Sequence, residues 1–245
     1  MSPTVPSALH QRLHDNQLTI ASLHRGGMSR RPDGAELLST DPELRYLVLE
    51  APLSAPLPPG CHSIRVMPWA GELSRQLREH GFWRRGGLLY MSLGRELPPP
   101  PVVADFRVER AHTLEALVAF TNLQLDAFPE LQDAGRRRFD FLLASQVRHL
   151  EDPSHHYVLG YQKGRAVSAG LLLRTGGVGG IYSLATQQAW RGRGMSRVLI
   201  ASLVDEARSN GCDVIALQVG SGARAERLYR RLGFEPEFEV SLYGR

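Results

Sequence analysis

The chain has 245 residues, of which 42% are hydrophobic and 22% are charged, and its 29 basic side chains slightly outnumber 25 acidic ones. This composition predicts a globular protein of one large or two small domains, and no apolar run approaches the roughly 18 residues that would span a membrane. The two cysteines, Cys61 and Cys212, lie far apart in unrelated contexts. They indicate neither a disulfide framework nor a metal site, so we expect both to be buried and the protein to be cytoplasmic.

The small positive net charge does not predict nucleic-acid binding. Lys163 is the only lysine, and the arginines are scattered or form short clusters, such as residues 136–138. A base-stacking surface needs a long basic tract with interleaved aromatic residues, which this sequence lacks. We interpret the arginine triplet as a solvated helix face and leave a docking site for an acidic group as the alternative.

The first 97 residues predict a small α/β segment. A helix is expected from Ala8 to about His24, and a strand over Arg45–Glu50 precedes a proline-rich loop that ends at Gly60. The paired glycines at 26–27 are interpreted as part of a surface loop. The remaining expected elements are a strand at Ile64–Met67, a helix across Glu72–His80, the pair Gly81-Phe82 and a strand at Gly87–Leu93.

A run of four prolines, Pro98–Pro101, predicts a stiff spacer, because proline fits neither a helix interior nor a central strand. We therefore expect domains at residues 1–97 and 103–245, joined by a linker at 98–102. Thr113 is expected to cap a helix that continues to Ala127. The other elements expected before the next glycine cluster are a strand at Asp105–Arg110, a helix from about Ala134 to Leu150, and a hairpin of Tyr157–Tyr161 and Ala166–Leu173 turned at residues 162–165.

The segment from Tyr182 to Ser196 predicts a strand, a glycine turn and the start of a helix. Gly192 and Gly194 let the backbone curl closely and expose its amides, and the following helix adds unpaired amides and a partial positive charge. Together with Arg191 and Arg193 they form a predicted anion cradle of pyrophosphate size. The chain then predicts a strand at Val214–Val219, a helix from about Ala223, the triplet Leu232-Gly-Phe234 and a strand at Glu237–Tyr243.

Two motifs in this order carry a family resemblance. Arg191-x-x-Gly194-x-Ser196 resembles the R/Q-x-x-G-x-G/A signature of the GNAT N-acetyltransferases, with serine at the last position. The segment from Ala225 to Phe234 is similar to their second signature, A-x-x-L-Y-x-x-x-G-F, although Gly222 stands where an asparagine is common. The resemblance covers residues 103–245 and implies the GNAT acyl-CoA N-acyltransferase fold, an α/β (mixed α+β) architecture with a mostly antiparallel central sheet flanked by helices. The order strand, helix, Gly-Phe, strand also occurs before residue 97, so we expect a reduced GNAT-like N-terminal domain.

The resemblance implies acetyl-CoA as cosubstrate and an amine of a small molecule, amino acid or peptide as acceptor. Main-chain groups of Leu184, Ala185 and Thr186 would pair with the pantetheine arm and polarise the thioester. The pyrophosphate would bind at residues 191–196, that is Arg191, Gly192, Arg193, Gly194, Met195 and Ser196. Tyr229 occupies the position of the family's general acid for the leaving thiolate. No metal, nucleic acid or membrane is expected, and a homodimer is left open.

The sequence does not single out a general base. The strand before the turn carries no carboxylate, whereas many GNAT enzymes place a glutamate there. The remaining candidates are Tyr182, Ser183, His155, His156, Glu130 and Asp133, or an amine that needs no base. The alternative function is therefore a non-catalytic module that binds acyl-CoA.

Overall fold

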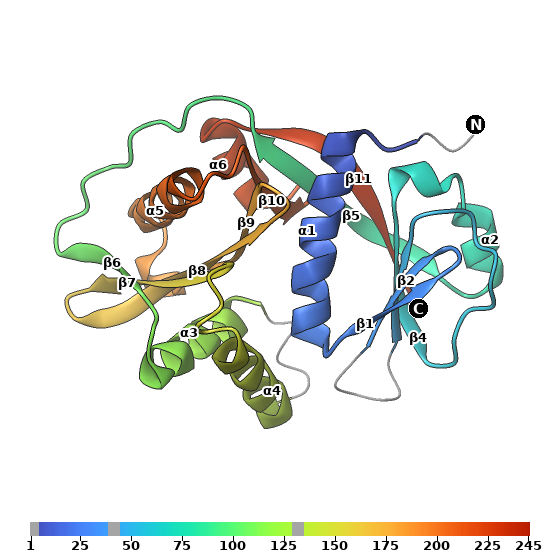
Figure 1. Cartoon of the computed structure of the whole chain (residues 1–245), viewed down its shortest axis with the longest axis horizontal. Helices are drawn as coiled ribbons and strands as arrows, with labels where there is room; N and C mark the ends of the chain where they lie inside the picture. Colours follow the sequence, from blue (N-terminus) through green and yellow to red (C-terminus); the bar gives the residue numbers. More distant parts are fainter. Residues whose placement is uncertain (1–4, 39–44, 129–134) are drawn as a thin grey trace. The chain divides into compact units, whose positions relative to one another are not determined.

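The computed structural model describes residues 5–38, 45–128 and 135–245 (Figure 1). Its contacts divide the chain into two compact units, residues 1–94 with 218–245 (unit 1) and residues 95–217 (unit 2). The first break falls just before the predicted linker. The second one lies inside the predicted second domain, so the last helix and strand of the chain group with the N-terminal residues by contact. None of the described helices is both long and apolar enough to cross a membrane.

Unit 2 is built on a sheet in the order β10–β9–β8–β7–β6. Its strands are β6 (Phe106–Arg110), β7 (His155–Gln162), β8 (Arg165–Thr175), β9 (Val178–Thr186) and β10 (Val214–Gly220), whose last residues belong to unit 1. All neighbours pair antiparallel except β9 and β10, which are parallel. The turn between β7 and β8 lies where it was predicted, because Lys163 and Gly164 adopt left-handed φ values of 49° and 77°.

Helices cover both faces of this sheet (Figure 1). Helix α5 (Met195–Ser209) packs closely over Gly170, where a β-carbon would lie 3.0 to 3.2 Å from three leucine side chains. Helices α3 (Leu114–Ala127) and α4 (Gly135–Arg148) contact each other on the other face. As predicted, Thr113 caps α3, and its side chain accepts a hydrogen bond from the amide of Ala116. A short 3₁₀ turn, η3 (Gln188–Trp190), precedes α5.

Unit 1 contains strands in the order β1–β2–β3–β4–β11–β5. They are β1 (Met28–Arg31), β2 (Gly34–Leu37), β3 (Arg45–Leu49), β4 (Cys61–Val66), β5 (Trp83–Leu93) and β11 (Phe234–Gly244), with helices α1 (Ala8–Arg25), α2 (Ser74–Glu79), η1 (Pro68–Ala70) and α6 (Arg224–Arg231). Only β3 and β4 are parallel. The β1–β2 hairpin was not predicted, because a polar four-residue strand has no clear alternation. Gly34 is required there, since a β-carbon would overlap the carbonyl of Val48.

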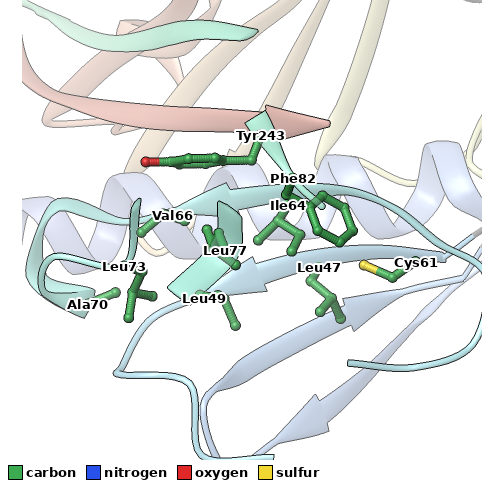
Figure 2. Packing of buried hydrophobic residues seen from close by; sticks show 10 residues of the cluster. All are labelled: Leu47, Leu49, Cys61, Ile64, Val66, Ala70, Leu73, Leu77, Phe82 and Tyr243. Atoms are coloured by element: carbon green, nitrogen blue, oxygen red, sulfur yellow. The ribbon is translucent and has the colours of Figure 1, made fainter. Parts of the chain in front are cut away.

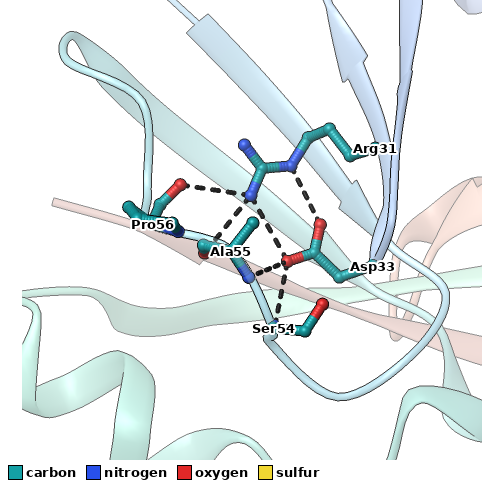
Figure 3. A network of polar contacts seen from close by, with 5 residues as sticks. All are labelled: Arg31, Asp33, Ser54, Ala55 and Pro56. Atoms are coloured by element: carbon teal, nitrogen blue, oxygen red, sulfur yellow. Dashed lines mark hydrogen bonds and ion pairs between the residues drawn. The ribbon is translucent and has the colours of Figure 1, made fainter.

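The core of unit 1 lies between β3, β4, α2 and β11 (Figure 2). Cys61 belongs to this cluster, and its burial raises the pKa of the thiol to about 11, which makes it unreactive. Cys212 is only half-buried, so the expectation that both cysteines are buried is wrong for Cys212. Asp33, with no exposed surface, accepts hydrogen bonds from Arg31 and from the amides of Ser54 and Ala55 (Figure 3).

The last strands of the two predicted repeats, β5 and β11, are neighbours in the sheet, and the repeat itself stays a prediction. β5 follows α2 and Phe82, and β11 follows α6 and begins at Phe234; the two strands lie antiparallel along their whole length, from Phe234 opposite Leu93 to Gly244 opposite Trp83. The observed fold class is thus the predicted one, a mixed α+β fold with mostly antiparallel sheets flanked by helices.

Candidate functional site

The glycine turn predicted from the sequence lies between η3 and α5. Gly192 and Gly194 have φ values of 80° and 84°, which are left-handed, and no side chain caps the N-terminus of α5. The carbonyl of Gly194 accepts the amide of Arg197, so the helix begins there, and the earlier amides have no partner within it. The turn is exposed and offers amide donors at the positive end of a helix.

The two arginines of the turn are fixed by short-range contacts. Arg191 Nε donates to the carbonyl of Thr186 at 2.8 Å. The guanidinium of Arg193 lies over the ring of Trp190, 4.8 Å from its centroid, and donates to the carbonyl of Ala189 at 3.3 Å. Each guanidinium has five N–H donors, so both retain donors and their full charge beside the turn.

The two glycines of the turn have different surroundings. A β-carbon at Gly192 would meet no atom within 4 Å, so that side of the backbone is open. A β-carbon at Gly194 would lie 2.7 Å from Pro101 Cγ. Arg197 also donates to the carbonyl of Pro99 at 3.1 Å. The predicted linker is therefore anchored against the turn, and glycine is needed at Gly194 for packing as well as for its φ.

The strand before the turn has an open edge. β10 pairs with β9 only from Val214 opposite Val178 to Leu217 opposite Ile181, whereas β9 continues to Thr186. On the other edge Gln187 donates to Val167 at 2.9 Å. Because hydrogen bonding alternates along an antiparallel pair, the backbone groups of Thr186 point away from β8, toward the open edge. The Thr186 carbonyl already accepts from Arg191 Nε, so the Thr186 amide is the group here that an extended ligand arm can pair with.

A β-bulge interrupts β9 just before this open stretch. The register shifts between Ala185 opposite Ala169 and Tyr182 opposite Leu171, and Ser183 has a left-handed φ of 51°. For a residue other than glycine this backbone costs about 1–3 kcal/mol, and such strain is concentrated at functional sites. The Oγ of Ser183 lies 3.0 Å from the carboxamide of Gln124 on α3.

The residues suggested as proton acceptors are dispersed. The buried ring of His155 contacts Asp152 and Ser154, and burial lowers its pKa. His156 lies 3.6 Å from Glu206 of α5, and burial lowers its pKa although that carboxylate opposes the shift. Tyr182 is buried in β9, and Ser183 is half-buried. Glu130 and Asp133 lie outside the described residues.

Tyr229 lies on α6 in unit 1, whereas the turn belongs to unit 2. Its ring contacts Phe234 edge-on at 6.2 Å, and burial raises the pKa of the phenol to about 12. Gly222 lacks the side chain of the expected asparagine. Its backbone amide donates to Glu226 at 2.8 Å and so helps to start α6. The role of Tyr229 stays a prediction.

The buried glutamines of α3 and α4 were missed by the sequence analysis. Gln124 and Gln146 are each 2% exposed, and their carboxamides lie 3.1 Å apart. A signal for Gln124 does exist in the sequence. Leu117, Phe120, Thr121 and Gln124 follow helical spacing, so two polar residues lie on the inward stripe of α3.

Residues 117–234 match the model of the acetyltransferase (GNAT) family, and the chain therefore carries a GNAT acetyltransferase domain. The family resemblance of the two sequence motifs is confirmed by this match.

Three relatives extend the comparison. The mycothiol acetyltransferase of Beutenbergia cavernae is 30% identical over 129 residues, which cover 51% of this chain and 43% of that protein. The chain thus matches less than half the length of this curated relative. A GCN5-related N-acetyltransferase from Kribbella flavida has a TM-score of 0.66 at 19% identity, with 95% of each chain covered. One from Sphaerobacter thermophilus has a TM-score of 0.62 at 21% identity, covering 75% of this chain and 59% of that chain. At these identities the two structures support the fold alone.

Proposed function

We propose that the chain is an acetyl-CoA-dependent N-acetyltransferase that acetylates an amine of a small molecule, amino acid or peptide by direct attack in a ternary complex. The observation that carries this proposal is the open edge of β9, which leads directly into the uncapped glycine turn of α5. An extended thiol arm would lie along the strand edge, and its pyrophosphate would reach the amides of the turn.

The residues present are chemically suited to such a cofactor. The amides from Gly192 to Ser196 would bind the pyrophosphate, and Arg191 and Arg193 would add charge. Main-chain groups of Leu184 and Thr186 would pair with the pantetheine arm, whereas those of Ala185, which the sequence analysis also assigned to the arm, face β8. When bound, acetyl-CoA supplies an activated acetyl thioester. The role of the protein is then to hold the thioester carbonyl against an amide and to orient the amine beside it.

Tyr229 is the proposed general acid for the departing thiolate. Because burial raises its pKa to about 12, the phenol keeps its proton throughout the neutral and mildly alkaline range. The same shift makes it a weaker acid than an exposed tyrosine, so it would act chiefly by hydrogen bonding to the thiolate as negative charge develops.

One observation favours the alternative of a non-catalytic acyl-CoA-binding module. The part of β9 before the turn, residues 178–186, holds no carboxylate, and Ser183 bonds to an uncharged glutamine. The two functions predict the same cofactor binding and differ only in turnover.

Two measurements test the proposal. Calorimetric titration with acetyl-CoA and free CoA should give micromolar binding. Thiol release from acetyl-CoA should then accelerate with at least one member of a panel of amino acids, dipeptides and amino sugars. Binding without any turnover would favour the non-catalytic module, and absence of binding would overturn both functions.

A further inference from the structure

Side chains of α3, α4 and β9 form a continuous polar chain inside unit 2. Thr121 Oγ1 lies 2.8 Å from the carbonyl of Leu117 and 2.7 Å from the carboxamide of Gln146. Gln146 contacts Gln124 at 3.1 Å, and Gln124 contacts Ser183 Oγ at 3.0 Å. The first three side chains are at most 2% exposed, whereas Ser183 is half-buried. Buried polar groups are costly unless paired, so the hydrogen bonds of this chain have to be mutually consistent.

The threonine at the buried end sets the direction of these bonds. Its hydroxyl has one hydrogen, and the carbonyl of Leu117 can only accept, so that hydrogen points to Leu117. Thr121 Oγ1 must then accept from Gln146. The structure places Gln146 Oε1 2.7 Å from Thr121 Oγ1, which would leave two oxygens with no hydrogen between them, so the two ends of this carboxamide have to be exchanged. The two ends of a carboxamide have the same shape, so its orientation follows from the network.

Each donor in this row of polar side chains must face an acceptor, and this requirement extends from Gln146 to Ser183. With its nitrogen toward Thr121, Gln146 presents its oxygen to Gln124, which must offer its own nitrogen there. Exchanging the two ends of Gln124 in the same way turns its oxygen to Ser183, in place of the nitrogen that lies 3.0 Å from Oγ, and the serine hydroxyl then donates its hydrogen inward. Among the described residues the hydroxyl of Ser183 has no second hydrogen-bond partner. Its two lone pairs are left for a group that does not belong to the protein.

We propose that Ser183 Oγ accepts a hydrogen bond from an N–H of the acceptor amine, and that Gln124 is the positioning residue that keeps the serine hydrogen turned inward. This inference rests on the proposed function, because Ser183 lies at the bulge directly before Leu184–Thr186, the stretch assigned to the thioester arm. The left-handed backbone of Ser183 and its bond to α3 together fix the position of the hydroxyl.

This arrangement suits an amine that is about to attack a carbonyl. The lone pair of the nitrogen must point at the thioester, so its N–H groups need acceptors on the other side. A hydroxyl that already donates to an amide oxygen is a stronger acceptor. As the nitrogen gains positive charge, its hydrogen bond to Ser183 strengthens, and the contact favours the transition state over the ground state. Ser183 binds and orients the amine and exchanges no proton with it.

The test removes the hydroxyl without straining the backbone. Ser183→Gly deletes the side chain and suits the φ of 51°, so relief of backbone strain should offset much of the cost of leaving Gln124 without its partner, and the protein should still fold. With the amine that reacts fastest in the panel, we expect its kcat/KM to fall about 10- to 100-fold, the range for a hydrogen bond to a charged group. The KM for acetyl-CoA should be unchanged. Calorimetry of the same amine with the CoA-bound protein should show the same weakening.

Two substitutions at Gln124 test the direction of the bond. Gln124→Met removes the partner of Ser183 and should lower kcat/KM for the amine, with no further loss in the double variant with Ser183→Gly. Gln124→Glu, kept protonated by its burial, can still donate to Gln146 and accept the serine hydrogen, so it should retain most of the rate near and below neutral pH. Equal losses in Gln124→Glu and Gln124→Met would overturn the inward direction of the serine hydrogen.

A control separates this role from general loosening of α3. Thr113→Ala removes the cap of α3 without touching the polar chain, so it should lower stability and leave the amine kinetics unchanged. An equal loss of amine kcat/KM in Thr113→Ala, or wild-type kinetics in Ser183→Gly, would overturn the inference alone. A wild-type protein that binds acetyl-CoA but acetylates none of the amines would overturn the proposed catalysis, and this inference with it.

Discussion

Gly192 is the residue at which the proposed pyrophosphate cradle, residues 191–196, can be tested most sharply. This residue and Gly164, in the turn between β7 and β8, have nearly equal φ values of 80° and 77°, and a β-carbon at either one would meet no atom within 4 Å. Valine in the left-handed region costs about 1–2 kcal/mol at each position. Gly192→Val and Gly164→Val should therefore lose similar stability, with Tm falling by about 2–4 °C per kcal/mol. They differ in that only Gly192 belongs to the proposed cradle.

The expected difference is in cofactor binding. If the valine side chain prevents two amides from reaching the pyrophosphate, about 3–6 kcal/mol of charge-assisted hydrogen bonding is lost. That corresponds to at least a 100-fold increase in Kd. Calorimetric titration with acetyl-CoA should show this loss in Gly192→Val and wild-type affinity in Gly164→Val. Equal affinity in the two variants would refute the cradle. Gly194→Val is unsuitable as a test, because its side chain would also collide with Pro101.

Three further outcomes are expected. Tyr229→Phe should lower kcat with little change in acetyl-CoA affinity, and a collapse of affinity would instead make Tyr229 structural. Because the pKa of Tyr229 is about 12, deprotonation of this phenol should not lower the rate between pH 7 and 10 in a rate–pH profile. Asp33→Asn should lower the free energy of unfolding by about 3 kcal/mol at neutral pH, as measured by urea denaturation. Burial opposes the ionisation of Asp33, but bonds from Arg31 and two amides prevail and lower its pKa, so the difference between wild type and variant should shrink as the pH falls through the carboxyl pKa. A difference that grows in acid would contradict this account.

The local elements were predictable because their signals are local. Thr113 at the start of α3, Asn210-Gly211 after α5 and the turn at Lys163-Gly164 are recognised from neighbouring residues alone. The anion turn belongs to the same group, because two glycines followed by an apolar helix need no distant partner. The β1–β2 hairpin escaped prediction because its strands are short and its pairing is stabilised by β3, whose residues lie farther along the chain.

The residues of the candidate site also include some that neighbouring residues identify and others that only distant contacts identify. The sequence showed that no carboxylate precedes the turn, but it offered no choice among Tyr182, Ser183, two histidines and two acidic residues. The choice of Ser183 depends on Gln124, which is 59 residues away along the chain. Side chains at such a separation meet only when a helix packs on a sheet, and their pairing follows from the burial of polar groups, not from spacing.

The sequence alone therefore determined the family resemblance, the order of most elements and the glycine turn before α5, since motifs and periodicity depend on residues a few positions apart. The tertiary structure decided which residues share a neighbourhood. It placed Pro101 against Gly194, opened the edge of β9 beyond Ile181, and joined Ser183 to the buried glutamines. It also grouped the last helix and strand with the N-terminal residues. Strand pairing and side-chain burial are long-range interactions, and the folded backbone alone brings their partners together.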